Sequence, residues 1–262
     1  KVSGKVSAKP GVKGRARISA AEWETRVDLA AAFRIAYHLG WNDKITNHIT
    51  ARVPGQPDHF LMNRRVLGWH EITASNLLKV DFDGNVIGEP GVPLAPAGFN
   101  FHSAILKAKP EINCVVHTHT SAALIVSAMK NGLSLIVDQT SCHIHGRVSY
   151  HAFEGYASER DEAPRIISDL GRNFVMIMRN HGLLGVGRTI AEAFVYTRRL
   201  IDACDLQVKL MSTGAEINTI PDDVLAFTHK QIEARQGDTP YGDGEWRMYR
   251  RLAAQLDPKF AK

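Results

Sequence analysis

The spacing of apolar and polar positions predicts helices interleaved with short strands. The clearest helix follows Ser19, because apolar residues recur at about every fourth position from there to Leu39. Such spacing puts the apolar side chains on one stripe of an α-helix. Ser19 and Glu22 have the separation of a capping box, and Gly40 is a typical residue just beyond a helix end. A helix over residues 19–39 is therefore predicted.

Short apolar runs bounded by turn residues predict strands, and longer runs with helical spacing predict further helices. The predicted strands are 45–53, 60–62, 77–82, 112–117, 133–137, 147–150 and 175–178. The predicted helices are 99–108, 121–129, 162–170, 190–213 (ended by Gly214), 224–234 and 245–256. This alternation predicts one three-layer α/β domain over residues 18–262, with a helical C-terminal segment. Tight turns such as Asp83-Gly84 indicate that its sheet is mixed.

The positive charge of the chain belongs to its N-terminal tail. The net charge is +5, yet residues 1–17 alone hold six lysines and arginines and no acidic residue. The tail is rich in Gly, Ser and Pro, a composition typical of disorder. It has no aromatic residue on which a base could stack, so we predict no nucleic-acid partner.

The apolar runs and the cysteines indicate in which cellular compartment the protein resides. No apolar run approaches the roughly 20 residues that a membrane helix needs, and the start lacks the apolar core of a signal peptide. The three cysteines are widely spaced and form no CxxC pair: Cys114, Cys142 and Cys204. Such cysteines are typical of reduced thiols in the cytosol. We therefore predict a cytoplasmic protein with no membrane partner.

Three histidines lie in two strand-like segments, 112–120 and 175–182. Residues i and i+2 of a strand point to the same side, so His117 and His119 could aim at one point, and an adjacent strand could deliver His181 beside them. Three neutral imidazoles leave an open coordination position, as catalytic zinc sites do. A His-x-His pair alone also fits exposed or hydrogen-bonded histidines. The combination predicts one divalent metal ion.

The segments around these histidines resemble the class II aldolase/adducin family. The matching stretches, within residues 20 to 235, are 47–52, 96–105, 114–120 and 179–183. The resemblance implies an αβα sandwich with a central, largely antiparallel sheet, and a homotetramer with its sites between subunits. It also implies a divalent metal, commonly zinc and sometimes manganese or cobalt. By the same resemblance, the metal ligands are His117, His119 and His181.

Two departures from the family pattern concern phosphate. Sugar-phosphate aldolases of the family carry Ser-Ser-Glu where this chain has Pro96-Ala97-Gly98. Their glutamate binds the resting metal and moves protons. The second phosphate loop falls around Arg65-Val66, and only Asn47 matches a phosphate-binding residue. Phosphorylated sugars are thus poor candidates. The pattern resembles the adducin-like branch, which holds cytoskeletal proteins and bacterial enzymes, including relatives that decarboxylate aromatic or heteroaromatic acids.

The missing glutamate also bears on the reaction. A metal held by three histidines can stabilise an enolate as a Lewis acid. Retro-aldol cleavage also needs a base, whereas decarboxylation needs only a proton donor afterwards. We therefore predict a metal-dependent carbon–carbon lyase, a decarboxylase or aldolase, acting on a small non-phosphorylated hydroxy, keto or aromatic carboxylic acid. The alternative is a non-catalytic adducin-like assembly or binding module. Adducins carry a neck and a lysine-rich tail after the head, whereas this sequence stops at Lys262, which favours the enzyme.

Other polar residues are candidates for supporting roles. His102 and Glu71 are candidate catalytic groups, although a helix histidine that caps a loop and a surface turn are the alternatives. Arg64 or Arg65 could clamp a substrate carboxylate, or simply be solvated. The remaining candidates are Asn47 for substrate binding, Asn180 and His143 for orienting the ligands or lining the entrance, and Tyr241 and Trp246 for closing a neighbour's site or for core packing.

Overall fold

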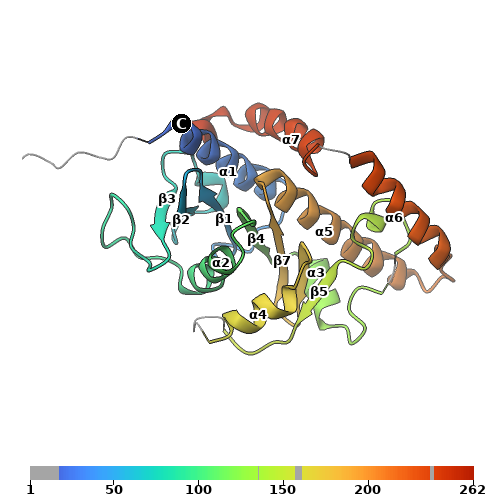
Figure 1. The fold of residues 1–262 in the computed structure, drawn as a ribbon. Helices are drawn as coiled ribbons and strands as arrows, with labels where there is room; N and C mark the ends of the chain where they lie inside the picture. Colours follow the sequence, from blue (N-terminus) through green and yellow to red (C-terminus); the bar gives the residue numbers. More distant parts are fainter. Residues whose placement is uncertain (1–17, 135, 157–160, 237–238) are drawn as a thin grey trace, which may run out of the picture.

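A single seven-stranded sheet organises the chain (Figure 1). The computed structural model describes residues 18–134, 136–156, 161–236 and 239–262, so the predicted disordered tail, residues 1–17, lies outside the described residues. The strands are β1 (His48–Val53), β2 (Gln56–Met62), β3 (Leu78–Asp81), β4 (Cys114–Thr118), β5 (Val148–His151), β6 (Val175–Met178) and β7 (Gly182–Gly187).

The order of the strands places β4 at the centre of the sheet. The order is β3-β2-β1-β4-β7-β6-β5, and all five residues of β4 are buried. β5 and β6 pair in parallel, and every other neighbouring pair is antiparallel. The expectation of a mixed, largely antiparallel sheet is confirmed.

Helices cover both faces of the sheet and complete three layers, which confirms the predicted αβα arrangement. One face carries α1, α3, α5 and α7, and the other carries α2 and α4. The helices are α1 (Ala20–His38), α2 (Pro96–Ala108), α3 (Ser121–Ala128), α4 (Ala163–Leu170), α5 (Ile190–Thr213), α6 (Asp222–Gln236) and α7 (Asp243–Leu256). In Figure 1, α6 lies beyond the sheet, beside the far end of α5.

The ends of α1 agree with the sequence pattern. The Ser19 hydroxyl accepts a hydrogen bond from the Glu22 backbone N–H at 3.1 Å, which satisfies one of the free donors of the first turn. The Glu22 carboxylate pairs with the side chains of Arg26 and Lys79. Gly40 has a φ of +71°, the left-handed conformation that commonly follows a helix end.

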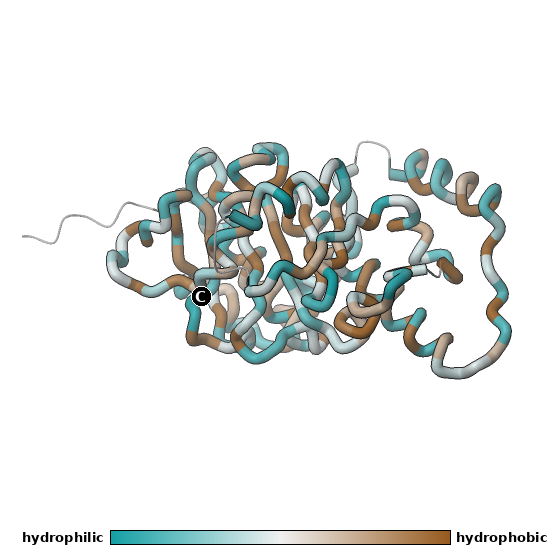
Figure 2. Tube along the Cα trace, turned by 90° about the horizontal axis from the view of Figure 1, so that it is seen from below, coloured by the Kyte–Doolittle hydropathy of each residue, from teal (hydrophilic) through white to brown (hydrophobic). Residues whose placement is uncertain are grey.

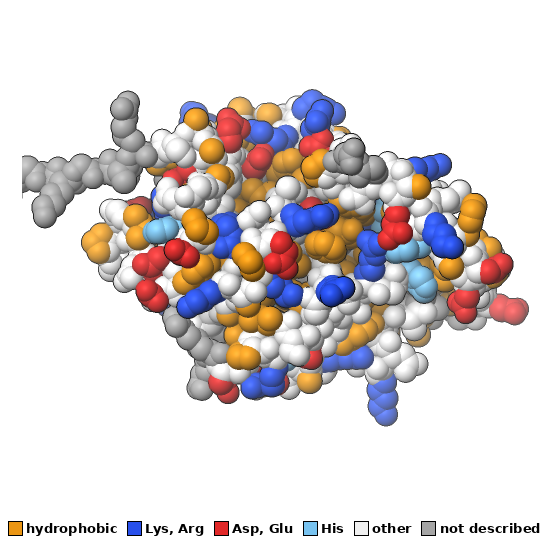
Figure 3. All heavy atoms as spheres, viewed as in Figure 1, with side chains coloured by type: hydrophobic (Ala, Val, Ile, Leu, Met, Phe, Trp, Pro, Cys, Tyr) orange, Lys and Arg blue, Asp and Glu red, His pale blue; other side chains and the backbone are white. Residues whose placement is uncertain are grey.

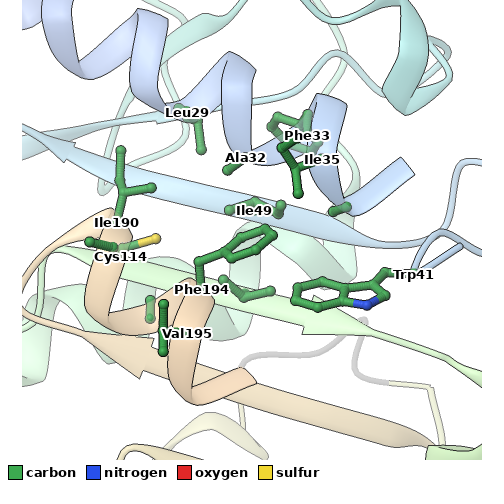
Figure 4. Close-up of a cluster of buried hydrophobic side chains, with 14 of the residues drawn as sticks. Leu29, Ala32, Phe33, Ile35, Trp41, Ile49, Cys114, Ile190, Phe194 and Val195 are labelled. Atoms are coloured by element: carbon green, nitrogen blue, oxygen red, sulfur yellow. The ribbon is translucent and has the colours of Figure 1, made fainter. Parts of the chain in front are cut away.

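Large apolar side chains fill the space between the sheet and the α1/α5 layer (Figure 4). Phe33 of α1 and Phe194 of α5 are fully buried, and Trp41 stacks on Phe194 with ring centroids 4.6 Å apart. Burying a side chain of this size contributes about 1.5–3 kcal/mol. Figure 2 shows the same arrangement along the chain, with hydrophobic stretches running through the middle of the body.

One predicted strand is absent, and one observed strand was not predicted. The described residues of 133–137 form no strand, because side chains take up their backbone donors. The N–H of Leu133 donates to the Tyr150 hydroxyl at 3.1 Å, and that of Ser134 to the Gln207 amide oxygen at 2.8 Å. β7 was missed because half of its residues are glycine. A Cβ at Gly185 would lie 1.9 Å from the Thr197 hydroxyl oxygen, so glycine is needed for α5 to pack closely.

The surface in Figure 3 carries acidic and basic side chains interspersed with one another. No helix within the described residues is both long and apolar enough to cross a bilayer.

Candidate metal centre

The three predicted ligands meet at one end of the central strands. His117 lies in β4, and His119 follows directly after this strand. His181 lies in the short turn between β6 and β7, so the prediction that it sits on a strand is wrong. The turn forms because Asn180 adopts a positive φ of 56°, which Asn tolerates better than most residues.

The three imidazoles converge without a carboxylate among them. The Nε2 atoms of His117 and His119 are 2.8 Å apart, and the His181 ring centroid lies 4.8 Å and 5.1 Å from theirs. One nitrogen of each of the three rings lies within 4.8 Å of the others. Gly182 allows this approach, because a Cβ there would lie 2.6 Å from Cδ2 of His119.

In two of these rings, the nitrogen that points away from the other imidazoles already has a polar partner. His117 Nδ1 lies 2.9 Å from the carbonyl oxygen of Leu183, to which it can donate. His119 Nδ1 lies 3.5 Å from a carboxylate oxygen of Asp43. A second partner of this kind fixes the tautomer of a metal-binding histidine and leaves the Nε2 lone pair free. The donor set therefore fits a divalent metal such as zinc.

The electrostatics also favour neutral imidazoles. Burial, together with the nearby His119 and His151, lowers the pKa of His181 to about 4. Burial lowers the pKa of His117 well below its usual range. Burial also lowers the pKa of His119, although Asp43 acts in the opposite direction. Neutral rings carry the lone pairs that a metal requires.

Sequence reasoning missed a fourth histidine at this centre, His48. It pairs across β1 and β4 with His117, and the two rings stack with centroids 6.3 Å apart. Its Nδ1 is enclosed without a hydrogen-bond partner among the described residues. Burial lowers the pKa of His48 to about 4. Its place beside Asn47 within the predicted strand 45–53 was the available signal, but nothing in the sequence paired β1 with β4.

His102, a predicted catalytic residue, lies behind His48. It is fully buried on α2, and its Nδ1 is 2.8 Å from the Thr50 hydroxyl. Its ring centroid lies 5.9 Å from that of His48, and its Nε2 is enclosed without a partner among the described residues. His102 is therefore separate from the three-ligand group.

The predicted substrate-binding and acid–base residues have varied surroundings. Both oxygens of Glu89 accept from Arg64 at 2.7 Å, whereas Arg65 is exposed and has no hydrogen bond or ion pair among the described residues. Glu71 accepts from the Gly68 backbone within its own turn, at 2.7 Å. Asn47 is buried, and its Nδ2 is enclosed without a partner in the described part of the chain.

His143 and Asn180 lie in different surroundings. His143 Nδ1 lies 2.9 Å from the Tyr241 hydroxyl, and both residues line a cavity of about 430 Å³ beside α6. None of the three ligand histidines lines that cavity. The Asn180 side chain is exposed, and the backbone N–H of Asn180 donates to Ser127. Asn180 therefore positions His181 through the backbone turn.

A second histidine group, unforeseen from the sequence, lies at the end of β5, next to β6. His151 is 2% exposed. Its Nδ1 lies 2.7 Å from a carboxylate oxygen of Asp169, and its Nε2 lies 3.2 Å from one of Glu162. Glu154 also belongs to this group, but its carboxylate is paired with Arg165. Carboxylates thus occupy both nitrogens of His151.

The chain has clear relatives among known sequences. The family described as "Class II Aldolase and Adducin N-terminal domain" matches residues 27–208. A protein of Pseudomonas aeruginosa with the provisional name aldolase class 2 protein is 45% identical over 218 residues, which cover 83% of each chain. Alpha-adducin of Rattus norvegicus is 40% identical over 224 residues, which cover 84% of this chain and 30% of the adducin.

Solved structures share the whole fold. An aldolase II superfamily protein from Pseudomonas syringae has a TM-score of 0.88 and 41% identity, over 94% of this chain and 98% of that one. An L-fuculose 1-phosphate aldolase from Glaciozyma antarctica has a TM-score of 0.81 and 29% identity, over 96% of this chain and 97% of that one.

Proposed function

Because this chain belongs to the class II aldolase and adducin family, we propose that it is a metal-dependent carbon–carbon lyase. Its substrate would be a small non-phosphorylated hydroxy, keto or aromatic carboxylic acid. The observation that carries the proposal is the convergence of three imidazoles, one buried and two partly buried, with no carboxylate among them. Zinc suits this donor set best, and manganese or cobalt are the alternatives.

Each residue of the proposed site would have a distinct role. His117, His119 and His181 would hold the metal, with Leu183 and Asp43 fixing the orientation of two of the rings. The bound metal would supply Lewis acidity that stabilises negative charge on a substrate oxygen. Arg65 is exposed and could bind a substrate carboxylate, whereas Arg64 is already paired with Glu89. A guanidinium matches the geometry of a carboxylate.

The proton requirements favour decarboxylation over retro-aldol cleavage. Retro-aldol cleavage must remove a hydroxyl proton, and position 98, which carries a glutamate in sugar-phosphate aldolases, is glycine here. Asp43 is the acid nearest to a ligand ring by the contacts described, and its side chain is 45% exposed. In decarboxylation the carbon–carbon bond pair stays on the substrate as carbon dioxide leaves, and a proton is added afterwards.

We also propose that the chain forms a homo-oligomer, most simply a tetramer, with the centre near a subunit contact. Apolar side chains are exposed close to the ligands. Leu124 and Ile125 lie on α3, which begins two residues after His119, and the half-exposed Phe153 ring lies 6.4 Å from that of His181. Exposed apolar groups that gather in this way commonly mark a contact surface. A monomer mass by light scattering at micromolar concentration would contradict this.

The second candidate function is a non-catalytic assembly or binding module. It is favoured by the 40% identity to alpha-adducin, whose length the match covers only in part. Such a module would keep the fold and the oligomer but would need no turnover.

Metal analysis combined with a substrate screen tests the two functions. Protein loaded with zinc, manganese or cobalt would be screened against hydroxy-acids, keto-acids, aromatic dicarboxylates and sugar phosphates for release of carbon dioxide or aldehyde. A lyase should turn over a carboxylic acid, and the His117→Ala variant should not. A metal-free wild type, or turnover of a sugar phosphate above ~10⁴ M⁻¹s⁻¹, would contradict the proposal.

A further inference from the structure

Gly98 lies where no other residue fits. It is the third residue of α2, and a Cβ built there would fall 2.5 Å from both Cγ and Cδ2 of His48. Two carbon atoms cannot approach this closely without displacement. The φ of Gly98 is not positive, so its backbone conformation would accept any residue. The need for glycine at position 98 therefore comes from the His48 ring, which supplies the three nearest atoms to the Cβ position.

The His48 ring has little room to move away. It is 4% exposed, its face stacks on His117 with an interplanar angle of 11°, and the His102 ring meets it edge-on at 83°. No hydrogen bond to Nδ1 holds the ring among the described residues, so packing sets its position. A buried polar atom without a protein partner is uncommon in folded proteins.

The side of the metal centre next to β1 thus consists of imidazoles. His48 lies directly across β1 and β4 from His117, and His102 lies against His48 on the side of α2. No described acidic residue belongs to the group of the three ligands, and Asp43 contacts only the far nitrogen of His119, so no carboxylate of this group would bind the divalent ion directly. A centre of this kind attracts anions more strongly than one with a carboxylate ligand.

We propose that His48 is a positioning and specificity-determining residue of this centre. Its ring fills the space beside His117 that a side chain at position 98 would need, so that a coordination position of the metal would be left to an anionic chelating ligand. The class of ligand that fits is a 2-hydroxy or 2-keto carboxylate, whose two oxygens can reach one metal ion. This inference rests on the proposed function, because it requires that the three histidines hold a divalent metal.

A double-mutant cycle tests the packing of His48 against Gly98. Replacing an exposed helix glycine by alanine normally stabilises a protein, because it restricts the unfolded chain. Gly98→Ala should instead lower the Tm by several degrees, whereas in the His48→Ala background the same change should be neutral or stabilising. Gly244→Ala is the matched control, since Gly244 lies in α7 with no atom near its Cβ position. If Gly98→Ala raises the Tm as Gly244→Ala does, the packing argument is wrong.

Calorimetric titration of the zinc-loaded protein with oxalate tests the ligand class. Wild type should bind oxalate at least tenfold more tightly than inorganic phosphate. The His48→Ala/Gly98→Glu variant should lose at least tenfold in oxalate affinity, because it places a carboxylate beside the metal. The His48→Ala/Gly98→Gln variant is the neutral control and should keep that affinity. Zinc content is measured separately for each variant.

The outcomes separate the two levels of inference. Equal oxalate affinities for the Glu and Gln variants, with zinc bound, would overturn the role of His48 and leave the proposed lyase standing. A wild type that binds no zinc would overturn the lyase and, with it, the choice of ligand. The double-mutant cycle would still decide the packing of His48 against Gly98 in that case.

Discussion

Two histidine groups lie side by side at the ends of β5, β6 and β4, and they satisfy their buried imidazoles in opposite ways. His151 has a carboxylate at each ring nitrogen. His117 instead faces a backbone carbonyl with one nitrogen and two other imidazoles with the other. A buried polar group needs a partner. The first group is complete within the protein, whereas the second has the donor atoms for the metal that we propose.

Removal of one of the three proposed metal ligands should have the largest effect, which is on zinc affinity. We expect His181→Ala to weaken zinc binding by at least about a hundredfold, since changes to groups that only support a ligand already cost 10–100-fold. The measurement is a competition titration against a chromophoric chelator. His151→Ala is the matched control and should retain zinc within a few-fold. Equal losses in the two variants would show that the groups form one site.

Acid should destabilise the metal-free protein next most strongly. His48 and His181 have folded-state pKa values lowered to about 4, below the ordinary value of 6.5. Between these values the unfolded chain binds protons that the folded chain does not, so stability falls as pH drops from about 6.5 towards 4. At pH 5 each imidazole of this kind should cost about 2 kcal/mol relative to pH 7.

Urea melts of the metal-free protein at pH 7 and pH 5 would measure this loss. His48→Ala should show a smaller decrease between the two pH values than wild type does. An identical decrease in both proteins would mean that His48 is not held neutral by the fold.

His151→Ala should have a smaller effect on stability and little on metal content. The change leaves Glu162 buried without its partner, while the half-exposed Asp169 can turn towards water. Breaking a fully buried pair costs about 3–5 kcal/mol, so a loss of about 2 kcal/mol is expected here. Chemical denaturation at pH 7 provides the number. A neutral result would show that the carboxylates do not depend on His151.

Asp43→Asn should have the smallest effect of the four. Asp43 is partly exposed and lies 3.5 Å from His119 Nδ1, so it orients the ring through a weak contact. We expect zinc affinity to fall by about tenfold, at the low end of the 10–100-fold range for ligand-supporting groups, because the contact is long and partly exposed. The same chelator titration applies, with Asp205→Asn on the exposed surface of α5 as the control. A loss as large as that of His181→Ala would make Asp43 a ligand.

Strong local sequence signals predicted the helices and strands well. The ends of α1 and α5 follow from Ser19, Gly40 and Gly214, each of which has a specific backbone role. Local signals failed where contacts with distant residues decided the secondary structure. Residues 133–137 have an apolar pattern but bond to distant side chains, and β7 is a strand in spite of its glycines because α5 packs against it.

The candidate site was predicted to a similar extent. The three proposed ligands were predicted from their spacing and from the family resemblance, and the structure brings these histidines together. Which strand pairs with which is not encoded in local spacing, so the neighbourhood of His48 and Gly98 could not be foreseen. Arg64 and Arg65 look alike in sequence, and only the position of Glu89 shows that one of them is already paired.

The contact between His117 and Leu183 has a consequence for folding. It joins residues 66 positions apart, and it exists only after β4 has paired with β7. Contacts of such long sequence separation form slowly, because a large loop must close first. The three histidines should therefore be among the last parts of the chain to come together. The rate of zinc uptake during refolding would then report the pairing of β4 with β7, and not the initial collapse of the chain.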